Sequence, residues 1–491
     1  MSFLNQSGDL SPFSEVVPDA ARVSGLTRSS ILTQRRRCRI TPQSGQNYGS
    51  GGAGAGNSQL QFLIADQGGL VDPRSIVLNY FIQTSADAIP DDGHPFTTVQ
   101  VLMNGQLMDN VQNAMKYTNV EMKMGGSQSY YRSAGSLQGF ELLNGDMITP
   151  VIGTTALTAN AAISAFGYVD QNFADIYART SRAGAAVTNG VAGEPRSIPL
   201  GLISGVGRMK SYLPVSLLGE LSIVLVTGTA GEVLFNNGAS ATGDYSLAQV
   251  SLEYDVVVPA PAYMSLLQKI ASDPSDSGVN LPFESAIVTA GASIATSATL
   301  TENSVIVSRA TNHLLRAHLV QIPTAALASL QYPSQSCFNH AGVWSVQFRI
   351  GSQTYPQVAA QGDAALFNMS LTAYGSASQE NGTVANRCIW SNNTQLTTNG
   401  TPAVYETAQA ATGGTIKFAY ADSFVPSYGF QTVKGAASPL DVDGVSLAGA
   451  SGSQLIATVI SAPPAAYTPF ICLVALKFIK AAGGSVSVIG A

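Results

Sequence analysis

Charged residues are scarce in this sequence. Asp, Glu, Lys and Arg make up 11% of its 491 residues, whereas about 25% is typical of soluble domains. Charge keeps a monomer of this size in solution, so a surface with so little of it favours extensive contact with other protein. The alternative interpretation is a secreted or surface β-sandwich module that binds a carbohydrate or protein ligand through a polar, uncharged exterior.

Cysteine and histidine are also rare, with four of each. None of the cysteines belongs to a CxxC pair or stands at zinc-ligand spacing from a histidine, so we expect no metal site, no disulfide framework and folding in a reducing compartment. His313 and His318 are five residues apart in a strand-like run and would point to opposite faces, which excludes one shared ion. The cysteines are Cys38, Cys337, Cys388 and Cys472, of which Cys472 is expected to be a small buried hydrophobe.

Local motifs of catalysis and nucleotide binding are missing. The sequence has no G-x-S-x-G, Walker A, HExxH or complete calcium loop. Gly49, Gly51 and Gly54 match G-x-G-x-x-G, but the strand-like run 59–64 follows them where a dinucleotide site needs a helix. We therefore predict that the protein is not an enzyme and uses no cofactor.

Long apolar runs are absent as well. The first 20 residues have neither a basic start nor an apolar core, so no signal peptide is expected. No stretch approaches the roughly 18 uninterrupted apolar residues of a membrane-spanning helix.

The sequence does contain one arrangement of apolar runs twice. An apolar run, a strand and turn, a helix-like stretch and two more apolar runs follow one another in each half, at offsets of roughly 220 to 250 residues. The matched segments are 75–84 with 312–321, 99–106 with 343–353, 110–124 with 361–373, 219–226 with 453–460, and 250–258 with 470–478. A tandem of two similar β-domains favours assembly over chemistry.

This duplication predicts an all-β protein of two tandem jelly-roll β-sandwiches with short helices in loops. Short runs rich in β-branched and aromatic residues alternate with Gly, Pro, Asn and Asp turns, as sandwiches require. We expect an N-terminal arm and Gly-rich linker at 1–57, a first jelly roll at 58–270 and a second at 280–491. Long polar insertions at 142–195 and 376–414 are expected to be exposed loops.

The arm carries most of the positive charge. Residues 1–57 hold six arginines and three acids, a net of +3, so the remaining chain has a net charge of −9. The cluster Arg35, Arg36, Arg37 and Arg39 would suit phosphates of a genome or a lipid surface. A solvated basic linker, or a strand edge protected by its charge, is the other interpretation. No strand is predicted in this segment, and we expect it to be ordered only by contact with neighbours.

Several blocks resemble one viral family. The segment 196–226 contains Ile198-Pro199-Leu200, Ser204-Gly205 and Tyr212-Leu213-Pro214, followed by Leu-Gly-Glu-Leu-Ser-Ile-Val-Leu-Val at 218–226. This order resembles double jelly-roll major capsid proteins of tailless icosahedral double-stranded DNA viruses, in the lineage of polinton-like viruses, virophages and nucleocytoplasmic large DNA viruses. The segments 250–263, 281–283 and 350–356 are similar to the end of the family's first roll, the start of its second, and an I-G-x-x-x-Y-P turn.

The resemblance implies a structural role in the virion capsid. Three copies would form a homotrimer whose six similar domains make a pseudo-hexagonal capsomer that tiles an icosahedral shell. Penton and minor capsid proteins would be its partners, and the arginines of the arm would lie on the inner face of the shell near the genome or an internal membrane.

Overall fold

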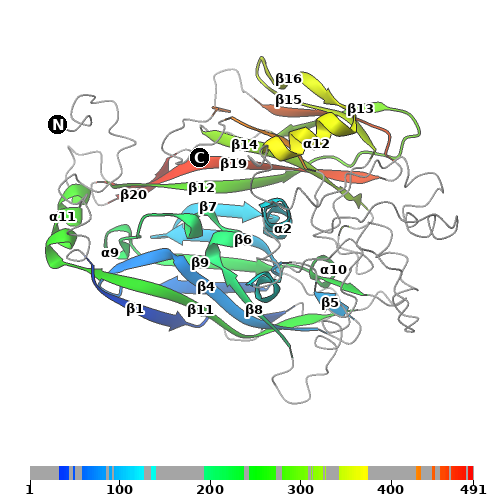
Figure 1. Cartoon of the computed structure of the whole chain (residues 1–491). Helices are drawn as coiled ribbons and strands as arrows, with labels where there is room; N and C mark the ends of the chain where they lie inside the picture. The colour runs from blue at the N-terminus through cyan, green and yellow to red at the C-terminus, as the bar shows by residue number, and fades with distance from the viewer. Residues whose placement is uncertain are drawn as a thin grey trace, which may run out of the picture.

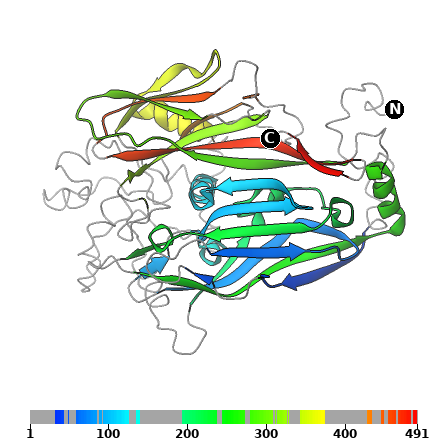
Figure 2. The same cartoon turned by 180° about the vertical axis from the view of Figure 1, so that it is seen from behind.

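The described residues form four large antiparallel β-sheets stacked in layers and one small two-stranded sheet, as the computed structural model shows (Figure 1). Sheets I and II belong to the first half of the sequence, and sheets III and IV to the second. Both views show sheet IV outermost on one side, sheet III beneath it, and the first half below (Figure 1, Figure 2). The residues described are 32–43, 48–49, 58–84, 88–90, 93–125, 134–139, 193–236, 243–272, 279–307, 311, 313–324, 327, 342–373, 427–432, 445–447, 454–463, 466–482 and 485–489.

The first half contains two large sheets. Sheet I has the strand order β1-β11-β4-β8, with the short β2 also paired to β11, and sheet II has the order β3-β9-β6-β7. The strands of sheet I are β1 (Leu32–Ile40), β2 (Tyr48–Gly49), β4 (Leu70–Thr84), β8 (Glu194–Pro199) and β11 (Tyr245–Pro259). Those of sheet II are β3 (Gln59–Ile64), β6 (Phe96–Met103), β7 (Gln106–Gln112) and β9 (Leu221–Thr227), and a small separate pair is formed by β5 (Ala88–Pro90) and β10 (Leu234–Asn236).

The second half repeats this topology. Sheet III has the order β12-β19-β14-β17, with β20 on β19, and sheet IV the order β13-β18-β15-β16. The strands of sheet III are β12 (Val279–Ala290), β14 (Leu314–Pro323), β17 (Tyr428–Gln431), β19 (Tyr467–Ala482) and β20 (Ser485–Ile489). Those of sheet IV are β13 (Thr301–Val307), β15 (Val343–Ile350), β16 (Gln353–Gln361) and β18 (Leu455–Ser461). The predicted duplication is thereby confirmed, because each matched pair of strand segments holds the same place in its sheet.

Helices fill the connections between strands. The two predicted ones are present, α2 (Ala114–Gly125) after β7 and α12 (Gly362–Ala373) after β16. The helix α11 (Pro261–Ser272) joins β11 to β12 at the side of the molecule (Figure 1). The remaining described helices are short: α4 (Ser136–Gln138), α8 (Leu200–Ile203), η3 (Gly205–Arg208), α9 (Val215–Leu218) and α10 (Ala230–Val233).

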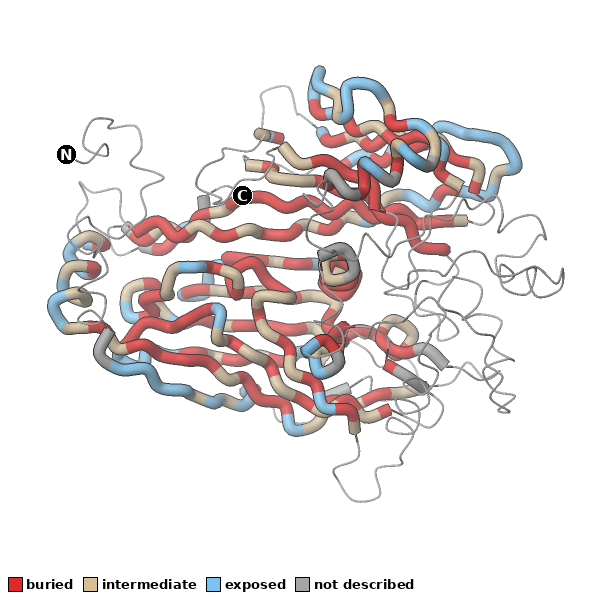
Figure 3. Tube along the Cα trace, viewed as in Figure 1, coloured by how far each residue is buried: buried red, intermediate tan, exposed pale blue. Residues whose placement is uncertain are grey.

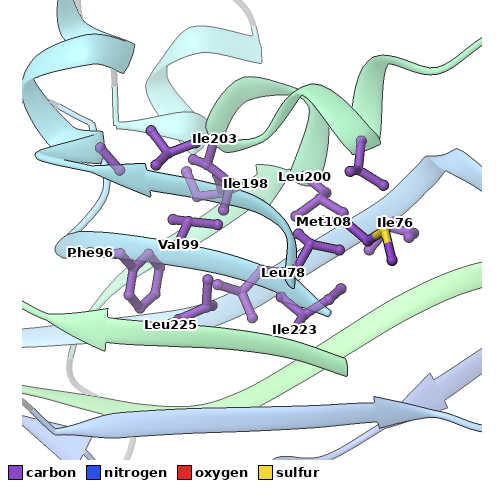
Figure 4. Packing of buried hydrophobic residues seen from close by; sticks show 14 of the residues in the cluster. Ile76, Leu78, Phe96, Val99, Met108, Ile198, Leu200, Ile203, Ile223 and Leu225 are labelled. Atoms are coloured by element: carbon purple, nitrogen blue, oxygen red, sulfur yellow. The ribbon is translucent and has the colours of Figure 1, made fainter. Parts of the chain in front are cut away.

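Alternation along the strands builds the core between sheets I and II. On β4, Ile76, Leu78, Tyr80 and Ile82 are buried, while the residues between them are partly exposed. Their inward side chains meet those of β6 and β9, including Val99, Ile223 and Leu225, in the close view of Figure 4. Each such aliphatic side chain contributes about 1.5–3 kcal/mol when fully buried, so this period-two pattern is a main reason that the sheets pair.

Sheet III is buried on both faces. Ile471 and Leu473 of β19 point into the core shared with sheet IV, whereas Phe470, Cys472 and Val474 join the core of the first half. Residues of β12 and β19 are buried along most of their length (Figure 3). The continuous apolar run of β19 follows from this position, because a strand covered on both sides cannot alternate with polar residues.

The strand β1 corrects the expected arm. The sequence predicted no strand in residues 1–57, but Leu32–Ile40 pairs antiparallel with β11, and this expectation was wrong. Cys38 and Ile40 pack against the core of the first half, while alternate arginines face outward. By topology β1 holds the place in sheet I that β12 holds in sheet III, so it forms the edge of the first sandwich. The expected insertions lie outside the described residues, apart from 193–195, where β8 begins.

Candidate functional site

The predicted basic site is a set of ion pairs on the outer face of sheet I. Arg37 lies opposite Asp255 and Arg39 opposite Glu253 in the register of β1 and β11. Arg35 donates from Nε to Asp255 Oδ2 at 2.8 Å and approaches Asp72 Oδ2 at 3.2 Å. Arg37 donates from Nε to Glu253 Oε2 at 2.8 Å.

These contacts occupy much of the positive charge that the sequence singled out. The hydrogen bond to Asp255 raises the pKa of Arg35 above its ordinary value, so this side chain stays charged. Arg36 donates to the Gln67 carbonyl oxygen, and Arg39 is exposed beside Glu253. Three acids therefore face the arginines of β1 from β4 and β11, which favours the interpretation of a charge-protected edge strand over a free phosphate-binding patch.

A second polar site lies where sheet III meets the first half, a contact that we call the inter-half interface. Asp109 of β7 is fully buried there. Its Oδ2 accepts hydrogen bonds from Ser204 Oγ at 2.6 Å and from the Gly205 amide at 3.1 Å, and its Oδ1 accepts one from Ser285 Oγ of β12 at 2.7 Å. Three donors from two halves compensate one buried carboxylate, which is the condition for tolerating it in a core.

Gly205 allows the backbones to approach at this point. A Cβ built on Gly205 would overlap the carbonyl group of Glu284 in β12. Because both partners are main-chain atoms, no side-chain rotation relieves the overlap. Glycine is therefore required for the observed distance between η3 and β12.

An ion pair between β14 and α2 also crosses the inter-half interface. Arg316 Nη2 of β14 lies 2.6 Å from Glu121 Oε2 of α2, and both side chains are largely buried. Burial alone raises the pKa of Glu121, but the charge of Arg316, with a smaller contribution from Arg208, outweighs it and holds the pKa below its ordinary value. The ammonium of Lys116 lies 5.2 Å from the ring centroid of Phe470, which adds a cation–π contact between the halves.

Two buried histidines are held neutral. Burial lowers the pKa of His94 and of His318 to about 3. The His94 Nδ1 atom accepts from the Phe96 amide at 3.2 Å, so Nε2 carries the proton and donates to Thr118 Oγ1 at 3.0 Å. Both positions are enclosed by the cores, and neither reaches solvent as a catalytic base would.

The described part of the chain contains no group of three or more His, Cys, Asp or Glu side chains suited to a metal ion. No helix among the described residues is long and apolar enough to span a membrane. Cys38 and Cys472 have free thiols, and Cys472 is buried as expected.

The polar residues of the inter-half interface were not predicted as a site. Asp109 and Ser285 are 176 positions apart, and no local pattern connects them. One indication was present, because Ser204-Gly205 belongs to the block that resembles viral capsid proteins. The resemblance of that block indicates a family, but it does not predict which residues the block contacts.

Solved structures share this architecture. A chain of the cryo-EM structure of the Sputnik virophage aligns over 97% of this chain and 92% of its own length, at 12% identity and a TM-score of 0.53. A chain of the quasi-atomic model of the PBCV-1 virus capsid aligns over 94% of this chain and 97% of its own, at 11% identity and a TM-score of 0.50. The mavirus major capsid protein aligns over 96% and 94% at 10% identity, with a TM-score of 0.48.

No family model matches the chain, and no curated protein matches it in sequence. The structural comparison therefore concerns the fold, which is that of a double jelly roll.

Proposed function

We propose that this chain is a major capsid protein of an icosahedral double-stranded DNA virus, with a structural role and no catalytic activity. The observation that carries the proposal is the double jelly roll itself, which aligns almost end to end with a chain of the PBCV-1 virus capsid. The low content of charged residues agrees with the proposal, since each interface of an obligate assembly buries on the order of 2,000 Å² or more of accessible surface.

The assembly unit in this proposal is a homotrimer. Two sandwiches of equal topology in each copy would give six similar domains around a three-fold axis. The inter-half interface supports this geometry, because its buried polar contacts and continuous core hold the two sandwiches of one copy in one orientation. A variable angle between the sandwiches would prevent regular tiling.

The division of the chain and its partners belong to the same proposal. The first roll would end near residue 270 and the second begin near 280, with β1 extending the first roll to residue 32. Copies of the same chain, penton proteins and minor capsid proteins would be its neighbours in the virion. Contact of Arg35, Arg36, Arg37 and Arg39 with genome or membrane stays a prediction, and the ion pairs of Arg35 and Arg37 weaken its electrostatic basis.

Solution mass and electron microscopy test the proposal together. The purified chain should elute as a stable species of three times 50.9 kDa in size-exclusion chromatography with light scattering. Negative-stain images should show hexagonal particles. A strictly monomeric protein at micromolar concentration would contradict the proposal and favour a binding module.

A further inference from the structure

The two halves match closely at the junction of one strand and one helix. A bulge interrupts the pairing at the first residues of β6 in sheet II and of β15 in sheet IV. The next strands, β7 and β16, each end directly before a residue with a positive φ, which is Asn113 at 52° in the first half and Gly362 at 75° in the second. A helix of 12 residues starts within one residue of each. The edge formed by β7 and α2 therefore corresponds to the edge formed by β16 and α12.

In the first half this edge is covered by the outer face of sheet III, the face turned away from sheet IV. Ser285 of β12 donates to Asp109 of β7. Lys116 of α2, whose ammonium lies over the Phe470 ring of β19, is only 5% exposed. The layers stack with most strands running in one common direction (Figure 1). One sandwich thus buries its edge against a sheet face of the other.

The corresponding edge of the second half lies at the surface. β16 is an edge strand of sheet IV, and Val358 on it is 81% exposed. Ala364 of α12 is exposed as well, and several exposed residues follow one another along β16 (Figure 3). Gln347 of β15 donates from Nε2 to the carbonyl oxygens of Pro356 and Gln357, at 3.1 and 3.2 Å, which fixes the outward segment of β16. The edge is therefore ordered by its own sheet and still presents apolar surface.

Trp344 adds to the apolar surface at this junction. Its side chain is 49% exposed, and a Cβ built on Gly362 would lie 3.9 Å from the indole ring. The exposed ring therefore lies beside the start of α12. An open edge strand with exposed apolar side chains is a template for other chains, so folded proteins normally cover such an edge.

The outer face of sheet I, which is turned away from sheet II, is the counterpart of the covering face of sheet III. Alternate residues of β4 are buried in the core, so Val77, Asn79 and Phe81 point outward. The pairing with β8 places beside them Pro199, Ser197 and Pro195. All six are uncharged and partly or fully exposed. This face therefore offers a neutral, partly apolar surface, and the two arginines of β1 that pair with acids lie at its border.

We propose that β16 and α12 of one copy bind the outer face of sheet I of the next copy, in the way that β7 and α2 bind sheet III within one chain. The inference rests on the proposed homotrimer and names the two surfaces that form its contacts. The open edge and the receiving face lie at opposite ends of the stack of four sheets (Figure 1). A contact between two different surfaces is head-to-tail, and it forms a ring when its rotation closes. Three chains then make six equivalent steps, and the strands keep their common direction throughout.

Single arginines on the two surfaces test the contact. Val358→Arg places a charge on the edge, and Asn79→Arg places one on the receiving face. Either variant buries an unpaired charge at every contact, so the concentration at which half of the trimers dissociate should rise about 10-fold or more. Ile306→Arg is the matched control, because Ile306 is 53% exposed on β13, at the opposite edge of the same sheet. The control should leave the trimer unchanged.

Mixing the two variants shows whether the contact is head-to-tail. The Val358→Arg chain keeps an intact receiving face, and the Asn79→Arg chain keeps an intact edge. An equimolar mixture should therefore form a 1:1 complex of twice 50.9 kDa at concentrations where each variant alone is monomeric. The blocked surfaces at the two ends of this complex prevent the addition of a third chain.

Sedimentation velocity of the full-length chains over a range of concentrations measures both effects, and melting temperatures show that the variants fold. Should Asn79→Arg lower the melting temperature, Ser197→Arg on the neighbouring β8 takes its place. Wild-type trimers that neither variant weakens, or a mixture without the 1:1 complex, overturn this inference and leave the proposed homotrimer standing. A wild-type chain that stays monomeric contradicts both. A wild-type chain that forms head-to-tail oligomers other than trimers, and loses them in both variants, supports the inference and contradicts the homotrimer.

Discussion

Replacing Gly205 with alanine tests how closely the two halves must approach. The added Cβ would overlap the carbonyl oxygen and carbon of Glu284, and neither atom can rotate away. Restoring an ordinary contact requires η3 and β12 to separate by roughly 2 Å. That separation would break the hydrogen bond from Ser285 to Asp109, which crosses the interface at 2.7 Å.

The cost follows from these two effects. Overpacking of a core costs about 1–3 kcal/mol, and a lost hydrogen bond to a buried charged acceptor about 1.5–3 kcal/mol. The free energy of unfolding should therefore fall by about 3–6 kcal/mol. At about 2.1 cal/mol/K per residue, the unfolding entropy of the whole chain is about 1 kcal/mol/K, so the melting temperature should fall by about 3–6 °C.

Differential scanning calorimetry of the purified protein measures this change. Gly201→Ala is the matched control, because it lies in α8 of the same connection and its Cβ would come 3.0 Å from the Gly207 oxygen, a close contact that a shift of a few tenths of an ångström relieves. We expect the control to change the melting temperature by about 1 °C or less. A Gly205→Ala variant that melts with the wild type, or with the control, would refute a backbone contact at this interface.

Three further variants or conditions test the remaining contacts. Glu121→Gln removes the carboxylate facing Arg316 and should lower the free energy of unfolding by about 3–5 kcal/mol, while Glu121→Gln/Arg316→Met should recover most of that loss. Urea unfolding measures both variants, and a double variant as unstable as the single one would argue against the ion pair. His94 and His318 have a pKa of about 3 when folded against 6.5 when unfolded, so the unfolded state binds more protons between these values. Lowering the pH from 6.5 to 5 should therefore lower the free energy of unfolding by about 1.5 kcal/mol per histidine, and equal denaturation midpoints at the two pH values would contradict this expectation. Deleting residues 1–47 removes β1 and uncovers the edge of β11, so we expect aggregation in size-exclusion chromatography. The control Arg35→Ala, at a side chain 55% exposed, should lower the free energy of unfolding by less than about 1 kcal/mol. A soluble deletion variant with the wild-type melting temperature would show that β1 is dispensable.

Periodicity made most of the fold predictable. The alternation on β4 and the apolar run on β19 are local patterns, and they recur at the same places of the two halves, so sandwich architecture and duplication followed from sequence. Helices α2 and α12 followed from the same comparison, although β7 extends to Gln112 and α2 starts only at Ala114.

The first strand was missed for a physical reason. Successive arginines hide the period of two, because Arg36 and Arg37 point to opposite faces and look alike in the sequence. The outward ones are stabilised by Glu253 and Asp255, more than 200 positions away. Long-range compensation of this kind, like the bond from Ser285 to Asp109, has no local signature.

The double burial of sheet III also sets an order of events during synthesis. The first half exposes the apolar side chains that β12 and β19 will cover, and β19 is synthesised well after β12. At about 5–20 residues per second, the interval between these two strands lasts roughly 10–40 s. During this time the nascent chain carries an open hydrophobic surface, so chaperone binding is expected to be strongest then. Closure of this core therefore waits for β19, and a chain lacking β19 would never bury that surface.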